Sequence, residues 1–161
     1  MGLPGRSPEY AVDILRPGQA VIVVTEPGRE NEARIRLARI GFDHVLGALC
    51  DIDDVLVARP DLAEQAPRIT AAELRTWRTS EPDLQIVDVR NPNECAGGIV
   101  DDAGNLPLPN LLDRIGELDP ARPTVVYCAG GYRSATAASL LRARGFTTVA
   151  DVYGGYAATC G

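Results

Sequence analysis

The 161-residue sequence contains no lysine, and all sixteen of its basic residues are arginine. Schiff-base chemistry on this chain, which needs a lysine amine, is therefore excluded. Histidine occurs once, at His44, and none of the four cysteines form a C-x-x-C pair. Zinc sites built from cysteine and histidine at their usual spacings are thus not expected, and we predict no metal and no cofactor. His44 is predicted to be a solvated turn residue, so catalysis should proceed without a histidine base.

Long apolar runs are also missing. No run approaches the roughly 20 residues of a membrane span, and residues 1–10 lack the apolar centre of a signal peptide. We therefore expect a cytoplasmic protein without a membrane partner. The net charge is −6, which favours no nucleic-acid partner. The chain is long enough for one full domain and part of a second.

The most informative segment is Cys128–Ser134, which reads Cys-Ala-Gly-Gly-Tyr-Arg-Ser. Residues 124–127 before it are apolar, β-branched or aromatic and predict a buried strand. Residues 134–144 after it predict a helix that Gly145 ends. Backbone N–H groups of such a loop, with the positive end of the helix, favour an anion, here the sulfur itself as thiolate or persulfide. We predict a nucleophilic cysteine of lowered pKa; the alternative is a buried structural cysteine.

Strand and helix patterns alternate through the second half of the chain. Helices are predicted from a capping box of Thr70 and Glu73 to about residue 77, over residues 110–118 with Asn110 as the cap, and over residues 134–144. A short turn or helix is predicted to begin at residue 91, and a final turn is predicted at residues 154–155. Strands are predicted over 85–89, 124–128 and 147–152. This alternation is typical of an α/β fold with a parallel sheet flanked by helices. Ligands of such sheets bind beyond the carboxyl ends of the strands, where Cys128 lies.

An internal similarity relates the two halves of the chain at a fixed offset of 104 positions. It places residues 21–24 on residues 125–128, and 41–42 on 145–146, so a strand–loop–helix–strand pattern occurs twice. Val24 stands in the place of Cys128, and Glu26 with Pro27 replaces the two glycines. We therefore predict that residues 1–66 form a partial, degenerate copy without cysteine chemistry; chance similarity is the alternative.

Residues 68–156 resemble a rhodanese domain, the single-cysteine sulfurtransferase fold. Five motifs occur in the order that family has. The first two are Asp88-Val89-Arg90 with Glu94 and the connector Asn105-Leu106-Pro107. The active loop follows, with Cys128, Gly131, Arg133 and Ser134, and the closing motifs are Gly145-Phe146 and Gly154-Gly155-Tyr156. The chain departs from the family at 97–104, at Cys95, where the family usually has an aromatic residue, and after Tyr156, where the usual tryptophan is missing.

The resemblance implies a rhodanese domain over residues 67–161 with Cys128 as its catalytic residue. The preceding copy is similar to the second half of an inactive rhodanese domain. That arrangement resembles fusions of a metallo-β-lactamase-fold persulfide dioxygenase with rhodanese modules, which implies such an oxygenase as a partner or fusion. The oligomeric state stays open.

The implied activity moves sulfane sulfur from thiosulfate or a low-molecular-weight persulfide to a thiol or cyanide, through a persulfide on Cys128. The resemblance assigns substrate binding to the loop: its N–H groups bind the persulfide, Tyr132 shapes the mouth, Arg133 orients the anionic donor, and Ser134 caps the helix. These residues are Ala129, Gly130, Gly131, Tyr132, Arg133 and Ser134. Structural support is assigned to Asp88, Arg90 and Glu94, with Arg90 paired to Glu94 or to the loop.

Alternative functions remain open at this stage. Rhodanese-like modules also serve as non-catalytic docking or regulatory domains. A cysteine phosphatase or arsenate reductase is a weaker alternative, because those enzymes have five residues between cysteine and arginine and this loop has four. Cys50, Cys95 and Cys160 could resolve an oxidised Cys128, but Cys95 is more readily explained as a core residue.

Overall fold

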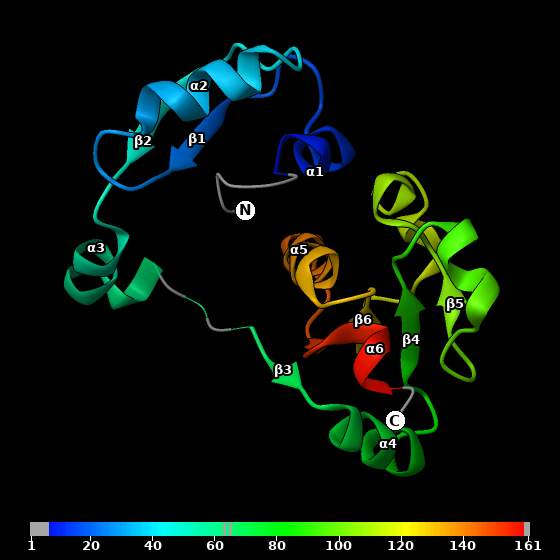
Figure 1. The fold of residues 1–161 in the computed structure, drawn as a ribbon. Helices are drawn as coiled ribbons and strands as arrows, with labels where there is room; N and C mark the ends of the chain where they lie inside the picture. The colour runs from blue at the N-terminus through cyan, green and yellow to red at the C-terminus, as the bar shows by residue number, and fades with distance from the viewer. Residues whose placement is uncertain (1–6, 63, 65, 160–161) are drawn as a thin grey trace. The chain divides into compact units, whose positions relative to one another are not determined.

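The computed structural model describes residues 7–62, 64 and 66–159 (Figure 1). The chain divides into two compact units, one within residues 1–65 and one within residues 66–161. Cys160 and the last residue of the predicted second unit lie outside the described residues. Within the described part of the chain, no helix has the length and apolar character needed to cross a membrane.

The second unit is a five-stranded sheet with the strand order β3-β7-β6-β4-β5, and every neighbouring pair is parallel. The α/β prediction with a parallel sheet and flanking helices is confirmed. The strands are β3 (Arg68–Ile69), β4 (Gln85–Asp88), β5 (Gly104–Asn105), β6 (Thr124–Tyr127) and β7 (Val149–Val152). The α-helices are α4 (Ala71–Ser80), α5 (Tyr132–Ala143) and α6 (Gly155–Thr159), and the 3-10 helices are η2 (Pro92–Gly97), η3 (Leu108–Asn110) and η4 (Ile115–Glu117).

The core of this unit follows from strands that are apolar on both faces. All four residues of β6 and of β7 are buried. Alternate side chains from β4, β6 and β7 form one buried cluster with Leu74 of α4, and Tyr156 of α6 packs against it. Because successive side chains of a strand point to opposite faces, the remaining residues face α5, whose Ala137 and Leu141 are fully buried. Figure 1 shows α5 on one side of the sheet and α4 with α6 on the other.

The strand register brings the candidate site residues to one edge of the sheet. Asp88, the last residue of β4, lies opposite Tyr127, the last residue of β6. The next amide, that of Val89, donates to the Tyr127 carbonyl at 2.9 Å. Cys128 and the segment that follows β4 therefore meet beyond the carboxyl ends of neighbouring strands, as the sequence predicts.

Several predicted elements are confirmed and one is wrong. The capping box of Thr70 and Glu73 opens α4, which continues to Ser80. The predicted helix over residues 110–118 does not form; two separate 3-10 helices, η3 and η4, occupy this region. Leu108 and Leu111 are both buried, and residues three apart share a face in the tighter 3-10 geometry. Gly116 also weakens an α-helix there by about 1 kcal/mol relative to alanine.

The first unit contains a two-stranded parallel sheet. β1 (Val21–Val24) pairs with β2 (Val45–Leu49), and α2 (Glu30–Ala38) lies between them in the sequence. The pair Ile22 and Gly47, moved by 104 positions, becomes Val126 and Asp151, which are paired in the second unit. The register agrees at this pair but not at Val21 and Val45, whose counterparts Val125 and Val149 are not partners, so the duplication remains a prediction. The other elements of this unit are α1 (Ser7–Ile14), α3 (Ile52–Ala58) and η1 (Pro60–Leu62).

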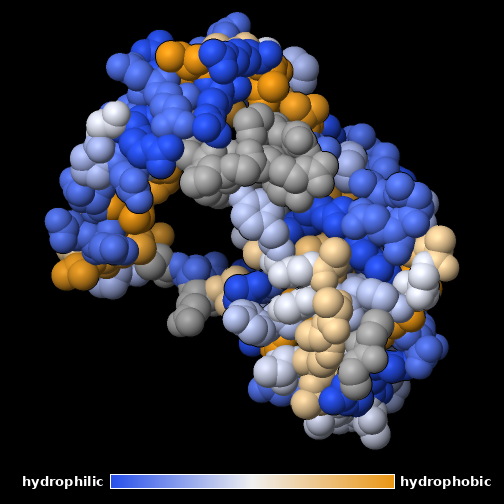
Figure 2. Space-filling view, in the orientation of Figure 1, coloured by the Kyte–Doolittle hydropathy of each residue, from blue (hydrophilic) through white to orange (hydrophobic). Residues whose placement is uncertain are grey.

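Large apolar side chains stay exposed on the first unit. Both Ile22 of β1 and Leu46 of β2 are more than three-fifths exposed. Figure 2 shows apolar residues between the hydrophilic ones on the surface of this unit. Both strands of a two-stranded sheet are edge strands, and one helix cannot cover both faces of the sheet. The exposure of apolar side chains therefore follows from the small size of this sheet.

Helix α6 packs closely against the segment after β6. Gly155 has φ +60°, and a Cβ there would collide with the Cys128 carbonyl oxygen and lie 2.8 Å from the Ala129 carbonyl. Gly145, after α5, has φ +92° but nothing within 4 Å of such a Cβ. An alanine at Gly145 would therefore lose stability only through its left-handed backbone, whereas an alanine at Gly155 would also collide with the loop.

We predict that Gly145→Ala lowers the free energy of unfolding by about 1 to 2 kcal/mol, the cost of a left-handed alanine. Gly155→Ala should lower it by about 3 kcal/mol or more, because α6 must also move away from Cys128. Denaturant unfolding of the two variants measures the difference. Equal losses would contradict the close packing of α6 on the loop.

Candidate active site

The sulfur of Cys128 lies at the bottom of a backbone loop. Cys128 follows β6 directly and is 1% exposed. The amide of Gly131 donates to its Sγ at 3.1 Å, and the Ser134 Oγ lies 3.6 Å from the same sulfur. The Ser134 hydroxyl accepts from the neutral thiol and can donate to the thiolate, so the amide and the hydroxyl together stabilise negative charge on sulfur.

The carbonyl groups of the loop are held away from the sulfur by other parts of the fold. The Cys128 carbonyl accepts from the Tyr156 amide at 2.7 Å, and the Ala129 carbonyl accepts from the Ala157 amide at 3.4 Å. Both amides belong to the start of α6, where N–H groups have no partner within the helix. Because carbonyl oxygens would repel an anionic sulfur, this pairing favours the thiolate.

Helix α5 begins two residues earlier than the sequence predicts. It begins at Tyr132, and its N-cap is Gly131, with φ +95°. The assignment of Ser134 as helix cap is therefore wrong. Ser134 lies in the first turn of α5 and is fully buried, where its hydroxyl approaches the Cys128 sulfur and its amide is free of intrahelical bonds. A glycine N-cap permits the abrupt change from loop to helix that this placement requires.

The environment of Cys128 shifts its pKa in two opposing ways. Burial raises the pKa, whereas the amides of Ser134, Gly130 and Gly131 and the Ser134 hydroxyl lower it. The donors prevail, and the pKa lies below the ordinary value of 9.0. Cys50 and Cys95 differ, because a hydrogen bond to Glu30 raises the pKa of Cys50 and burial raises that of Cys95. Cys128 is thus the described cysteine best suited to act as a nucleophile.

Arg133 has a different partner from the one the sequence predicts. Its two terminal nitrogens each donate to a carboxylate oxygen of Glu94 at 2.6 Å. This fork-shaped pair joins the start of α5 to η2, and the Arg133 side chain is only 13% exposed. The Arg133 guanidinium is therefore held by Glu94, and its role in orienting an anionic donor stays a prediction.

Asp88 and Arg90 form a buried ion pair, as the structural assignment expects. Arg90 Nη2 donates to Asp88 Oδ2 at 2.6 Å and to the Gly98 carbonyl at 2.8 Å. Arg90 does not pair with the Glu94 carboxylate; it donates to the Glu94 carbonyl at 3.2 Å. The guanidinium also lies 3.9 Å from the centre of the Tyr156 ring. Arg90 therefore connects the segment after β4 to α6, which supports the loop.

The remaining loop residues are more accessible. Ala129 and Gly130 are exposed, and Tyr132 is 44% exposed, as expected for a residue at the mouth of a site. Cys95 is partly buried, and its Sγ lies 3.6 Å from Asp88 Oδ2. His44 is exposed, as expected. Among the residues that the structure describes, no three His, Cys, Asp or Glu side chains are grouped to hold a metal ion.

Two contributors to the site were missed as site residues by sequence reasoning. Arg68 of β3 donates to the Gly131 carbonyl at 3.3 Å, although 63 positions separate them in the chain. Tyr156 supplies the amide that holds the Cys128 carbonyl. The Gly154-Gly155-Tyr156 motif was a signal for the second contact, but no local pattern marks Arg68.

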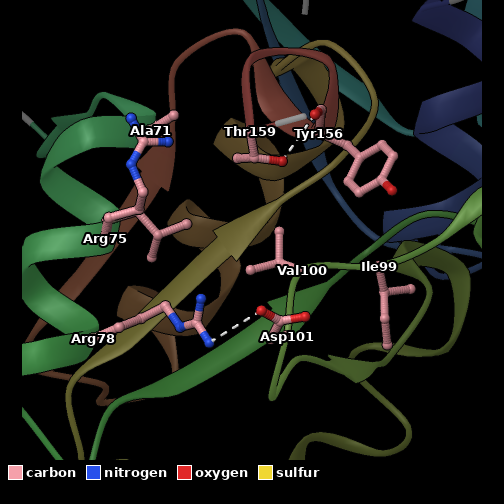
Figure 3. A pocket seen from close by; sticks show the side chains of 9 residues that line it. Ala71, Arg75, Arg78, Ile99, Val100, Asp101, Tyr156 and Thr159 are labelled. Atoms are coloured by element: carbon pink, nitrogen blue, oxygen red, sulfur yellow. Dashed lines mark hydrogen bonds and ion pairs between the residues drawn. The ribbon is translucent and has the colours of Figure 1, made fainter. Parts of the chain in front are cut away.

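A cavity of about 250 Å³ lies between α4, residues 99–101 and α6. Figure 3 shows Arg78 and Asp101 on one side of it and Tyr156 near α6. None of residues 128–134 lines this cavity. It is therefore distinct from the space above the Cys128 loop.

Comparisons with known proteins agree with this site. The rhodanese-like domain family matches residues 70–160. The thiosulfate sulfurtransferase GlpE of Shewanella oneidensis is 41% identical over 80 residues, which cover 50% of this chain and 79% of GlpE. The uncharacterized protein YqhL of Bacillus subtilis is 40% identical over 80 residues, with 50% of this chain and 64% of YqhL covered.

Solved structures give the same result. The crystal structure of a rhodanese-like domain protein from Staphylococcus aureus is 31% identical, with a TM-score of 0.54, and the match covers 58% of this chain and 90% of that one. The family match includes β4 to β7 and the Cys128 loop. The chain belongs to the rhodanese-like domain family.

We predict that Ser134→Ala raises the apparent pKa of Cys128 by about 0.5 to 1, because one donor to the sulfur is lost. Ser139→Ala, on the same helix but exposed and bonded to the Ala135 carbonyl, should leave the pKa unchanged. The ultraviolet absorbance of the thiolate, followed against pH in a variant with Cys50, Cys95 and Cys160 replaced by serine, measures it. Equal pKa values in the two variants would contradict this role of Ser134.

The Arg133 guanidinium lowers the pKa of Glu94 from 4.5 to about 2. A carboxyl group with a lower pKa in the folded state stabilises the fold above pH 4.5 and loses that contribution as the pH falls toward 2. Because Glu94 is one-third exposed, we expect a contribution on the order of 1 to 2 kcal/mol.

Between neutral pH and about pH 3, the free energy of unfolding should accordingly fall less in the Glu94→Gln variant than in the parent protein. The more exposed pair of Arg114 and Glu117 offers a matched control. Arg114 also lowers the pKa of Glu117, but solvent screens this pair, so Glu117→Gln should change the pH dependence much less. Urea unfolding at both pH values measures the difference. A parent-like acid response in Glu94→Gln would argue against the ion pair.

Proposed function

We propose that this protein is a sulfurtransferase that carries sulfane sulfur on Cys128. This proposal depends on one observation: the buried Cys128 sulfur accepts a hydrogen bond from the Gly131 amide at 3.1 Å, and the Ser134 hydroxyl lies beside it. A preorganised group of donors around one sulfur lowers the energy of an anionic thiolate and of an anionic persulfide alike. The Cys128 loop therefore fits both states of a sulfur carrier.

The proposed chemistry has two displacement steps. The Cys128 thiolate attacks the outer sulfur of thiosulfate; a new S–S bond forms, the donor S–S bond breaks, and its electron pair leaves with sulfite. A thiolate or cyanide acceptor then attacks the outer sulfur of the persulfide, and Cys128 leaves as a thiolate. A low-molecular-weight persulfide can replace thiosulfate, with its thiolate as the leaving group. No histidine base is needed, because Cys128 enters and leaves as an anion.

The names of relatives support this activity at a coarser level. GlpE is named a thiosulfate sulfurtransferase, and a relative from Allochromatium vinosum, 37% identical over 73 residues, is named a sulfurtransferase. The chain spans about two thirds of YqhL and more than three quarters of GlpE. The donor and acceptor of this chain are therefore part of the proposal.

A phosphatase is disfavoured by the position of Arg133. An enzyme of that class directs its arginine at the phosphate, but here both terminal nitrogens of Arg133 bind Glu94. Four residues separate Cys128 from Arg133, so the loop also has a smaller radius than a phosphate needs.

We predict that the protein gains the mass of one sulfur atom when it is incubated with thiosulfate or glutathione persulfide. Cyanide should remove the added sulfur. Cys128→Ser should gain none, whereas Cys95→Ser should behave like the parent protein. Intact-mass spectrometry of the reduced, folded proteins measures the change.

Absence of an adduct from both donors would contradict the proposed activity and favour a non-catalytic docking module. Loading that persists in Cys128→Ser would contradict the role of Cys128 itself.

A further inference from the structure

Arg68 connects the sheet edge to the Cys128 loop. It begins β3, lies opposite Asp151 in the register, and precedes residues 70–160, which match the family. Its Nε and Nη2 both donate to the Asp151 carboxylate, at 3.0 to 3.2 Å. Nη2 also donates to the Gly131 carbonyl at 3.3 Å. One guanidinium thus binds a side chain of β7 and the backbone of the active loop.

Gly131 is the residue through which this contact reaches the sulfur. Its amide donates to Cys128 Sγ, and its carbonyl accepts from Arg68. Gly131 has φ +95°, a backbone conformation that disfavours other residues, and a Cβ added there would lie 3.1 Å from the Arg68 Nη2 atom. The amide and the carbonyl belong to the two peptide planes that meet at the Gly131 Cα, so the bond from Arg68 fixes one plane and the sulfur is bound by the other.

We propose that Arg68 is a positioning residue for Cys128, which keeps the Gly131 amide directed at the sulfur by holding the Gly131 carbonyl. The expected effect of Arg68 on the rate of sulfur loading rests on the proposed function, whereas its expected effect on the pKa of Cys128 does not. Asp151 holds the guanidinium in place from β7, and the Tyr153 ring lies 5.4 Å from it.

The action of Arg68 is geometric rather than a matter of charge. The Asp151 carboxylate neutralises the guanidinium and is almost completely buried. The pairs of Arg133 with Glu94 and of Arg90 with Asp88 are likewise neutral. What Arg68 contributes is the fork of a planar guanidinium, which serves two acceptors at once.

The first test separates the loop contact from the ion pair. A lysine ammonium ends one bond short of Nη2, so Arg68→Lys can bind Asp151 but not reach the Gly131 carbonyl. We expect it to raise the apparent pKa of Cys128 by about 1, the loss of one donor to the thiolate. Arg68→Gln combined with Asp151→Asn should do the same without leaving a buried carboxylate unpaired.

A destabilised control shows whether the effect is specific. Phe146 is buried after the far end of α5, roughly 18 Å of helix from the loop. Phe146→Leu should lower the melting temperature but leave the pKa of Cys128 unchanged. If Arg68→Lys keeps the parent pKa, or if Phe146→Leu raises it equally, the positioning role is wrong.

The second test uses the rate of sulfur loading from thiosulfate. At a pH below the pKa of Cys128, a positioning residue should slow loading at saturating thiosulfate by roughly three- to tenfold for a donor worth one pKa unit, because fewer Cys128 side chains are thiolates. The thiosulfate concentration for half-maximal rate should stay the same. An increase in that concentration with an unchanged maximal rate would instead make Arg68 a donor-binding residue and overturn the proposal.

The two tests fail independently. A parent protein that loads no sulfur contradicts the proposed function, and the pKa comparison still decides the role of Arg68. A parent protein that loads sulfur, with Arg68→Lys unchanged in pKa and rate, contradicts only the role of Arg68.

Discussion

The hydrogen-bond donors around the Cys128 sulfur, among them the Ser134 and Gly131 amides, are the contacts on which the site depends. A buried thiol normally resists ionisation, because the thiolate loses its hydration. Here burial is outweighed by donors that the backbone itself supplies, and the pKa of Cys128 is lowered. Backbone amides serve this purpose only when the chain holds them in position and turns the carbonyl groups elsewhere. Most other features of the second unit contribute to that orientation.

Three arginines share the task of fixing the surroundings of the loop. Arg133 joins the start of α5 to Glu94 of η2, and Arg90 joins Asp88 to the carbonyl of Gly98. Arg68 joins Asp151 to the carbonyl of Gly131. Each guanidinium binds a carboxylate, and two of them also bind backbone carbonyls, as the planar fork of arginine permits. A chain whose basic residues are all arginine is well suited to this kind of support.

The amino-acid sequence predicted much of this architecture. The β-branched run before Cys128 and the alternating patterns indicated a parallel sheet, and the carboxyl end of β6 follows from that topology. Local signals such as the capping box at Thr70 succeeded because they involve neighbours in the chain. The predicted helix over residues 110–118 was wrong, because the chain forms two short 3-10 helices there and Gly116 disfavours a continuous α-helix.

The details of the site were less accessible to sequence reasoning. Arg133 was predicted to orient the donor because it follows the loop closely, whereas its pairing with Glu94, 39 positions away, was not predicted. The contact of Arg68 with Gly131 spans 63 positions and has no local signature. Long-range pairs of this kind depend on the register of strands and helices in space, which one sequence does not reveal.

Nuclear magnetic resonance of the loop amides tests the central claim most directly. In the reduced protein, the amide proton of Gly131 should shift with pH as Cys128 ionises, with a midpoint below 9.0, the ordinary value for a thiol. The shift should vanish in Cys128→Ser. A Gly131 amide that does not respond while Cys128 titrates would contradict the account, because the sulfur would then draw its stabilisation from another source.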